Sequence, residues 1–306
     1  MNIDTNETKK FDEIYDYIYN KNGNKLKKIK SKNNNIIHFF LIVCIIVNCI
    51  IYFVIEAKFI VVGTVTLSFC IMLVVMIVIR KGYGTLYKKY IIEELVKQYN
   101  NKFYYNSSVG ITQAEYRMSE FDNTFNKYHS EDRIYGNFEN GANIQIAEVA
   151  TYIRQESVDV NGNKTVSEKE TYRGMYGIVR LPKEVPTSIY ISEDSKFNRF
   201  SKSRIEVDSA EFEQYFDCSA RNKIIAMRIF TADLIEKYVD IMRKYKYKLQ
   251  MKIEYDRIFF RYKTGCLFEP PTFGNDLDRQ TVKKYYDMIV GPLELINKTV
   301  ENINQL

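Results

Sequence analysis

Hydrophobic residues are not spread evenly along this chain, because two long uncharged runs lie near its N-terminus. The first run covers residues 36–55 and the second covers residues 59–79. A helix rises about 1.5 Å per residue, so about 20 residues cross a hydrocarbon core of roughly 30 Å. Neither run has the polar stripe that marks a surface helix of a soluble protein. We therefore predict two transmembrane helices, in preference to a pair of helices buried in a large soluble domain.

Only three residues separate the runs, so the predicted helices form an antiparallel hairpin with both flanks on one side of the membrane. Six lysines lie from Lys21 to Lys32 with no acidic residue among them, and Arg80 and Lys81 follow the second run. Lys and Arg next to a span mark its cytoplasmic end. We expect a multi-pass protein of the cell membrane whose N-terminus and C-terminal domain are cytoplasmic. A cleaved signal peptide is not expected, because the first run is longer than the apolar region of a signal.

The segments that flank the hairpin show helical spacing. Before it, apolar side chains recur every three or four residues at Phe11, Ile14, Tyr15 and Ile18. This spacing predicts a short amphipathic helix within a basic N-terminal segment, residues 1–35, and Asn22-Gly23-Asn24 is expected to end that helix. After the hairpin, a helical pattern from 83 to 100 predicts a juxtamembrane helix within residues 80–105.

Residues 106–306 alternate between helical and strand periods. This mixture predicts a cytoplasmic α+β domain with antiparallel β-hairpins and flanking helices. The elements expected in its first half are a helix near 112–128, strands from 133 onward, hairpin turns at Asn140-Gly141 and Asn161-Gly162, a strand over about 165–180 that ends at Pro182, and a short strand over 188–192.

The second half of this domain has clearer patterns. Leu234, Tyr238 and Ile241 lie on one face of a helix that Thr231 is expected to cap. The other elements expected there are a helix from about 221, strands over 249–253 and 258–262 joined by a tight turn at 255–257, and a helical pair over 278–290 and 292–303 that Gly291-Pro292 splits.

The net charge of +6 is concentrated beside the hairpin. Residues 1–35 hold eight lysines against five acidic residues, whereas residues 82–306 hold 33 basic against 32 acidic residues. A nucleic-acid-binding domain would carry a basic excess of its own. We therefore expect no nucleic-acid partner. The lipid bilayer is the expected partner of the two helices, and a protein partner or a second copy of the chain is possible for the domain.

The cysteines indicate neither disulfides nor a zinc site. Three of the five lie in the predicted spans, and Cys218 and Cys266 stand alone without a C-x-x-C partner. Asn48 lies near the middle of the first span, and we expect it to hydrogen-bond across the hairpin to Thr64 or Ser68.

No catalytic constellation is recognisable. His129 is the one histidine after the predicted spans, and a Ser-His-Asp or Cys-His site would need it together with Ser130, Asp132 or Cys218. We prefer a solvated loop histidine, because no nucleophile motif accompanies it. One histidine and two isolated cysteines do not make a metal ligand set, and no phosphate-binding glycine loop is present. We expect no catalytic, cofactor-binding or metal-binding residues, and no cofactor.

Neighbouring carboxylates are the remaining candidates for Mg²⁺ binding or acid–base chemistry. The sequence favours none of them, and solvated faces or helix caps explain them as well. Asp278 in particular is expected to cap the helix that follows it. The pairs are Glu131/Asp132, Glu193/Asp194 and Asp276/Asp278.

Several stretches, taken together, resemble one protein family. They are residues 132–136, 144–148, 172–176, 211–218, 231–236 and 252–262. They resemble the bacterial membrane family called Domain of Unknown Function 3137, over most of residues 36–300. The resemblance implies two spans near the N-terminus followed by a cytoplasmic α+β domain. It implies no activity, because the family has no established function.

Two hypotheses for function remain. The favoured one is a non-enzymatic integral membrane protein whose cytoplasmic domain binds or scaffolds a ligand of unknown identity. It follows from the clear anchor and the lack of a catalytic motif. The alternative is a membrane-tethered hydrolase or transferase that uses acidic residues, with His129 or a tyrosine as a further group. A deep polar pocket with converging carboxylates would favour the enzyme.

Overall fold

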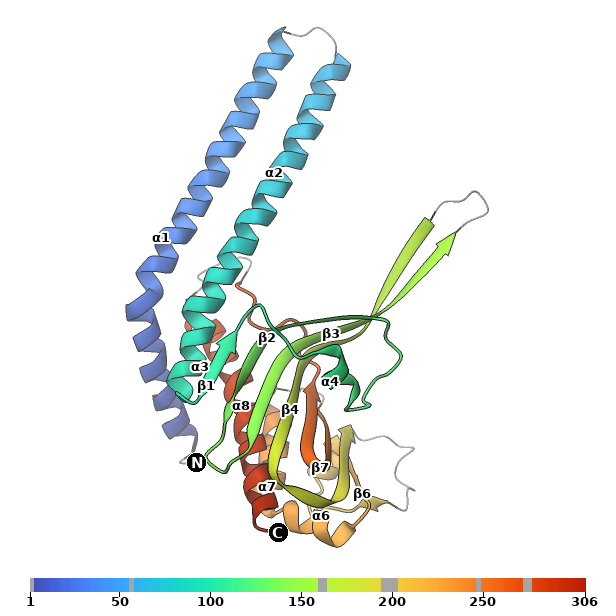
Figure 1. Cartoon of the computed structure of the whole chain (residues 1–306). Coiled ribbons are helices and arrows are strands. Elements are labelled where there is room, and N and C mark those ends of the chain that lie inside the picture. The colour runs from blue at the N-terminus through green and yellow to red at the C-terminus, as the bar shows by residue number, and fades with distance from the viewer. Residues whose placement is uncertain (1–2, 55–57, 159–163, 194–202, 246–248, 272–276) are drawn as a thin grey trace. The chain divides into compact units, whose positions relative to one another are not determined.

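The computed structural model describes the chain except for residues 1–2, 55–57, 159–163, 194–202, 246–248 and 272–276 (Figure 1). The chain divides into two compact units, and each is described by itself. Unit 1 comprises Met1–Leu95 and Glu269–Val282, and unit 2 comprises Val96–Phe268 and Lys283–Leu306. The predicted α+β class is confirmed, because long apolar helices come first and an antiparallel sheet with helices follows.

Unit 1 is built on two long antiparallel helices, α1 at Ile3–Val54 and α2 at Lys58–Tyr87 (Figure 1). A π-helical stretch, η1 at Lys88–Ile92, and then α3 at Glu93–Tyr99 continue directly from α2. The helical pattern predicted over 83–100 is therefore present as the end of one long helical segment.

The helix end predicted at Asn22-Gly23-Asn24 is wrong, because α1 runs through these residues without a break. Asn22 is buried, and its side-chain amide donates to the Tyr90 carbonyl at 2.9 Å. Gly23 is closely packed, since a Cβ there would lie 3.3 Å from Leu277 Cδ1. Such packing offsets the cost of about 1 kcal/mol that glycine brings to a helix interior.

Each long helix contains a stretch with the length and composition of a membrane span. These stretches lie within Thr8–Val54 and Phe59–Tyr99, and the most apolar 18-residue window of each has a mean hydropathy of 2.7 and is 0% buried. The Asn48 amide donates to Ser68 Oγ at 2.9 Å, which confirms the hydrogen bond predicted across the hairpin. Two apolar windows of this length without a buried residue suggest association with a membrane.

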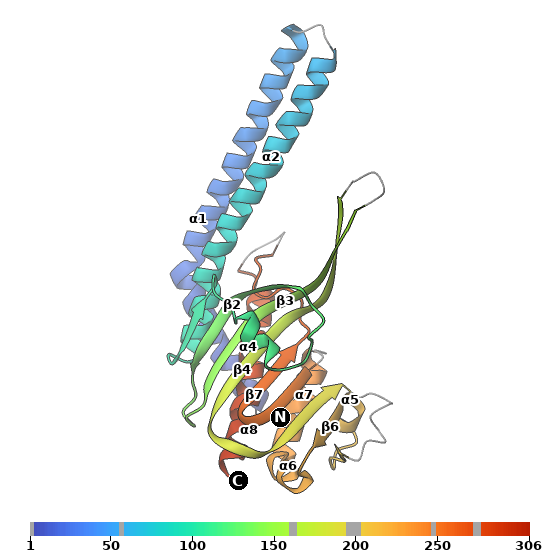
Figure 2. The ribbon, with the colours of Figure 1, turned by 45° about the vertical axis from the view of Figure 1, so that its right-hand side comes forward.

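Unit 2 contains a seven-stranded antiparallel sheet (Figure 2). The strand order is β1-β2-β3-β4-β6-β5, and β7 also pairs with β4. The strands are β1 at Phe103–Asn106, β2 at Lys127–Asn137, β3 at Asn143–Val158, β4 at Lys164–Glu193, β5 at Arg204–Ile205, β6 at Phe216–Ala220 and β7 at Leu249–Tyr262.

β4 is one strand of 30 residues, so the strand end predicted at Pro182 is wrong. Its pairing with β7 shifts register between Arg180 and Val185 and again between Val185 and Ile189. Pro182 and Pro186 both lie in this interval. Proline has no N–H to donate and is tolerated where the ladder is already interrupted. The short strand predicted after Pro186 is the end of β4.

β7 is a single strand rather than the predicted hairpin. Residues 251–253 and 257–262 both pair with β4, in one continuous antiparallel direction. Tyr255, where the turn was expected, has a φ of 53° and opposes Val185. The positive φ is therefore a local irregularity within a strand and not a reversal of the chain.

The turn predicted at Asn140-Gly141 is present between β2 and β3, and Gly141 has a φ of 89°. Its counterpart at Asn161-Gly162 lies outside the described residues. On either side of it, β3 and β4 extend as a two-stranded ribbon in which Ile153 to Val158 pair with Lys169 to Lys164 (Figures 1 and 2).

Two of the predicted helices differ from the structure. The helix expected near 112–128 is only five residues long: Thr112 and Glu115 form a capping box at its start, but it ends at Arg117, and β2 begins at Lys127. The split at Gly291-Pro292 is wrong, since one helix continues through it with Pro292 inside. The helices of unit 2 are α4 at Gln113–Arg117, α5 at Phe212–Tyr215, α6 at Lys223–Ile229, α7 at Ala232–Tyr245 and, from Lys283 onward, α8 at Arg279–Asn304.

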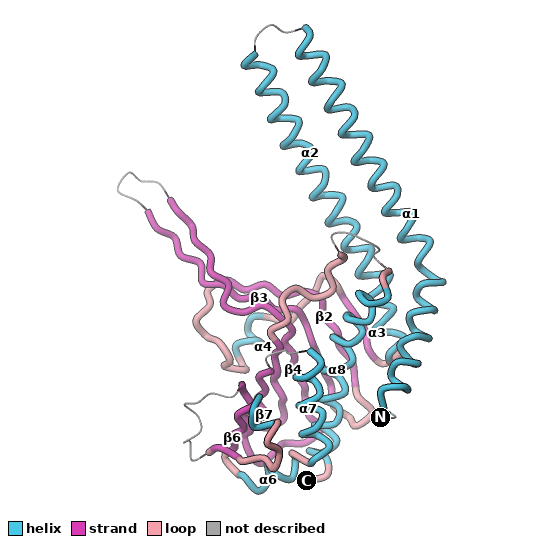
Figure 3. Tube along the Cα trace, turned by 180° about the vertical axis from the view of Figure 1, so that it is seen from behind, coloured by secondary structure: helices cyan, strands magenta, loops and turns pink. Residues whose placement is uncertain are grey.

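α7 and α8 cover one face of the sheet (Figure 3). The predicted stripe of Leu234, Tyr238 and Ile241 is buried. Tyr238 packs edge-on against Phe216 of β6 at 5.8 Å between ring centroids, and its hydroxyl lies 3.0 Å from Met251 Sδ of β7. The apolar side chains that alternate along the strands thus face these two helices.

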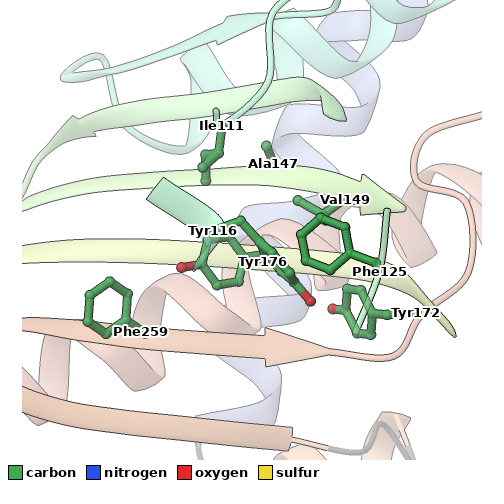
Figure 4. Close-up of a cluster of buried hydrophobic side chains, with 8 residues drawn as sticks. All are labelled: Ile111, Tyr116, Phe125, Ala147, Val149, Tyr172, Tyr176 and Phe259. Carbon is green, nitrogen blue, oxygen red and sulfur yellow. The ribbon is translucent and has the colours of Figure 1, made fainter. Parts of the chain in front are cut away.

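α4 lies on the opposite face of the sheet, over a cluster rich in tyrosine (Figure 4). Tyr116 of α4 packs edge-on against Tyr176 of β4 at 4.7 Å between ring centroids. Phe125 and Tyr172 lie beside this pair. The cluster covers the centre of this face and ends before the part of the sheet formed by β4, β6 and β5.

Candidate functional site

A polar groove lies on the α4 face of the sheet, next to the tyrosine cluster. The described residues around it leave a cavity of about 550 Å³. Tyr190 of β4 lies opposite Lys252 of β7 on one side and opposite Ser219 of β6 on the other. Side chains of directly paired residues point to the same face of a sheet. The floor therefore presents a phenol, an ammonium group and a hydroxyl in one row across three strands.

The segment that follows α4 forms one wall of this groove. Phe121 contacts Tyr190 at 6.3 Å between ring centroids, and Glu120 forms an ion pair with Lys252 at 2.8 Å. Glu120 has a φ of 60°, a left-handed conformation that costs about 1–2 kcal/mol for a residue with a Cβ. The ion pair and the ring contact fix this wall on the sheet despite that cost.

Lys252 is held in its charged form by two carboxylates. Its Nζ lies 2.8 Å from Glu120 Oε2 and 2.9 Å from Glu254 Oε2. Burial alone would lower the pKa of Lys252, but the hydrogen bonds to Glu120 and Glu254 raise it above its ordinary value. The same hydrogen bond lowers the pKa of Glu120. Both groups are therefore ionised at neutral pH and are engaged with each other.

Arg221 supplies a cation that is not engaged in this way. Its backbone N–H donates to the Ser188 carbonyl at 3.1 Å, which extends the pairing of β6 with β4 past Ala220. Arg221 lies two residues after Ser219, so its side chain points to the same face of the sheet. It lines the groove and is exposed. Within the described part of the chain, no carboxylate pairs with the Arg221 guanidinium.

Two hydroxyls of the floor are also available to a ligand. Neither the Ser219 hydroxyl nor the Tyr190 hydroxyl has a hydrogen-bond partner among the described residues. Burial raises the pKa of Tyr190, so its phenol is protonated at neutral pH and can donate. A guanidinium and hydroxyl donors are the groups that bind carboxylates and phosphates in proteins. The groove therefore has the chemistry of a site for a small anion.

The residues considered for nucleophilic catalysis do not come together in this groove. His129 is exposed on β2, not in a loop as predicted, and its Nε2 lies 3.7 Å from Glu131 Oε2. Ser130 Oγ donates to the Glu148 carbonyl at 2.7 Å and accepts from the Ile111 N–H. Both contacts are structural, and they leave His129 without a hydroxyl nucleophile.

The other two residues of that set are buried. Asp132 accepts a hydrogen bond from the Tyr105 hydroxyl. Cys218 lies in β6 on the face covered by the helices, and burial, with the nearby charges of Glu213 and Asp217, raises the pKa of its thiol to about 12. A thiol with a pKa of about 12 stays protonated at physiological pH and is therefore not a nucleophile there.

Of the paired carboxylates, Asp278 accepts from the Thr281 N–H at 3.0 Å, as the predicted helix cap requires. Asp194 and Asp276 lie outside the described residues. The expectation that the chain binds no metal and no cofactor stays a prediction.

Sequence patterns alone did not reveal the groove. Tyr190, Ser219 and Lys252 come from three strands separated by about thirty residues each, and their approach depends on β4 pairing with β6 and β7 at once. The alternation of Tyr190 with buried Ile189 and Ile191 was the one available signal, because it shows a strand with a polar face.

Comparison with known proteins confirms the predicted resemblance over part of the chain. Residues 170–299 match the family described as "Protein of unknown function (DUF3137)". A search of curated protein sequences gave no match. Among solved structures, the crystal structure of the mycobacterial trehalose monomycolate transport factor A, TtfA, is similar over 69% of this chain and 97% of that chain, with a TM-score of 0.33 and 11% identity.

Proposed function

We propose that this chain, whose residues 170–299 match a family of unknown function, is a membrane-anchored module that binds a small anionic ligand in its polar groove. The observation that carries the proposal is the Arg221 guanidinium beside the hydroxyls of Ser219 and Tyr190, three groups that have no partner among the described residues. A ligand carboxylate or phosphate would accept hydrogen bonds from all three groups.

The charges of the groove support binding rather than catalysis. Lys252 and Glu120 are both ionised and paired with each other, so neither is poised as a general acid or base at neutral pH. His129 and Cys218 do not line the groove. Among the described residues that line the groove, a ligand meets hydrogen-bond donors and positive charge but no activated nucleophile.

The anchor in this proposal is the hairpin at residues 36–79, with spans at 36–55 and 59–79. The lysines from Lys21 to Lys32 and the pair Arg80 and Lys81 support a cytoplasmic position for both flanks, by the positive-inside rule. Residues 1–35 then form a basic cytoplasmic segment, 80–105 a juxtamembrane helix, and 106–306 the ligand-binding domain.

Binding of inorganic phosphate to the full chain in phosphatidylcholine nanodiscs tests the proposed function. We expect saturable binding, measured by equilibrium dialysis with labelled phosphate, and about tenfold weaker binding for Arg221→Gln, because a hydrogen bond to a charged group is lost. Arg228→Gln is the matched control, since Arg228 is exposed on α6 and does not line the groove. Equal binding by Arg221→Gln and the unaltered chain would contradict the proposal.

A further inference from the structure

A second groove lies beside α7 and differs in character from the polar one. It runs between the segment 205–211 on one side and α6 and α7 on the other, and its cavity has a volume of about 410 Å³. Phe230, Ile235 and Val239 form its apolar floor. A volume in this range takes a small ligand or a few side chains of a partner.

Acidic side chains surround this apolar floor. Glu206, Asp208 and Glu236 line the groove, are exposed, and have no cationic partner among the described residues. By contrast, Glu211 is already bound: Arg243 Nε donates to its Oε1 at 2.6 Å. The single cation of the lining is thus neutralised by a neighbour, and three carboxylates remain to attract positive charge.

Met227 of α6 adds an adaptable apolar contact at the edge of the groove. Its side chain is 59% exposed and is therefore accessible to a partner. Methionine is unbranched and polarisable, and it is common on surfaces that accommodate a partner's side chains. Lys223 and Arg228 of the same helix do not line the groove.

We propose that this groove docks a basic amphipathic segment of a partner protein. Apolar side chains of the segment enter the cavity over Phe230 and Val239. Its lysines or arginines pair with Glu206, Asp208 and Glu236 of the rim, as in other grooves that bind amphipathic segments. The proposal is independent of the anion site, because the two grooves share no lining residue.

The test uses the full chain in phosphatidylcholine nanodiscs and two fluorescent 14-residue peptides. One is an amphipathic Leu/Lys peptide, and the other is its Leu/Glu counterpart with the same apolar face. In fluorescence anisotropy we expect saturable binding of the Leu/Lys peptide only. The combined Glu206→Gln, Asp208→Asn and Glu236→Gln variant should bind it about tenfold more weakly and with a smaller dependence on salt, because each exposed ion pair contributes modestly. These residues are exposed, so the variant is expected to fold.

Site-specific photocrosslinking separates groove binding from adsorption to the nanodisc. A photoreactive amino acid in place of Met227 should capture the Leu/Lys peptide, whereas the same group in place of Ser157, on the distant ribbon, should not. The proposal is overturned if the triple variant binds the peptide as tightly as the unaltered chain, or if the Leu/Glu peptide binds equally well. It is also overturned if Met227 crosslinks to a second copy of the chain in preference to the peptide.

Discussion

At the scale of single residues, the buried carboxylate of Glu148 joins three segments of the sheet domain. Its Oε1 accepts from Arg173 Nη1 at 3.1 Å, and its Oε2 accepts from the backbone N–H of Leu267 at 2.6 Å. Glu148 is only 2% exposed, so these contacts replace the water that a carboxylate would otherwise bind. The residue holds the chain after β7 against β3 and β4.

We predict that Glu148→Gln lowers the free energy of unfolding by about 2 kcal/mol, because the amide cannot pair with Arg173 and places a donor beside existing donors. Urea unfolding of the full chain in detergent micelles, followed by far-ultraviolet circular dichroism, measures this change. Glu168→Gln is the control, since Glu168 pairs with Lys127 at the surface and its loss should cost less than about 0.5 kcal/mol. Equal effects of the two substitutions would show that Glu148 is not a structural link.

At the scale of elements, the seam between β4 and β7 depends on a glycine. A Cβ at Gly174 would lie 2.1 Å from the Tyr262 carbonyl oxygen, and this backbone atom cannot move without disturbing the end of β7. The absence of a side chain at Gly174 thus allows the two strands to approach each other here.

Gly174→Ala is predicted to destabilise unit 2 by about 3 kcal/mol, because overpacking against backbone cannot relax as it does against a flexible side chain. The same urea experiment measures it. Gly82→Ala in α2 is the matched control, since nothing lies within 4 Å of a Cβ there and alanine favours a helix. A loss below about 1 kcal/mol at Gly174 would mean that the seam is more pliable than its geometry indicates.

Elements with a clear period could be predicted from the sequence, and those that depend on distant contacts could not. The stripe of Leu234, Tyr238 and Ile241 and the turn at Asn140-Gly141 are local signals, and both are present. Pro182 and Gly291-Pro292 are typical of the ends of elements. A strand nevertheless continues through the first and a helix through the second, because tertiary packing outweighs local propensity. The polar groove needed the pairing of β4 with two partners, which no local pattern encodes.

At the scale of the whole molecule, orientation in the membrane can be tested with a native cysteine. Cys266 is exposed in unit 2, whereas Cys218 is buried and the pKa of its thiol is raised to about 12. Only Cys266 of these two should react with a maleimide at pH 8, because the thiolate is the reactive form.

We predict that a membrane-impermeant maleimide leaves Cys266 unlabelled in intact cells and labels it after permeabilisation, as a cytoplasmic domain requires. Peptide mapping by mass spectrometry assigns the label, and Cys266→Ser should remove it. Labelling of Cys266 in intact cells would place the domain outside and overturn the orientation.

The pairing of β4 also has a consequence for how the domain is made. One side of β4 meets β3 and then β6, whereas the other side pairs with β7, whose residues follow 60 to 87 positions later in the chain, from Ile191 with Met251 to Met175 with Tyr262. During synthesis, residues 175–191 of β4 can pair with β7 only after residues 251–262 have left the ribosome. An open strand edge of this length is a template for pairing with another chain. The growing polypeptide therefore carries an open strand edge until its last strand arrives, and this edge makes the incomplete chain prone to misassembly.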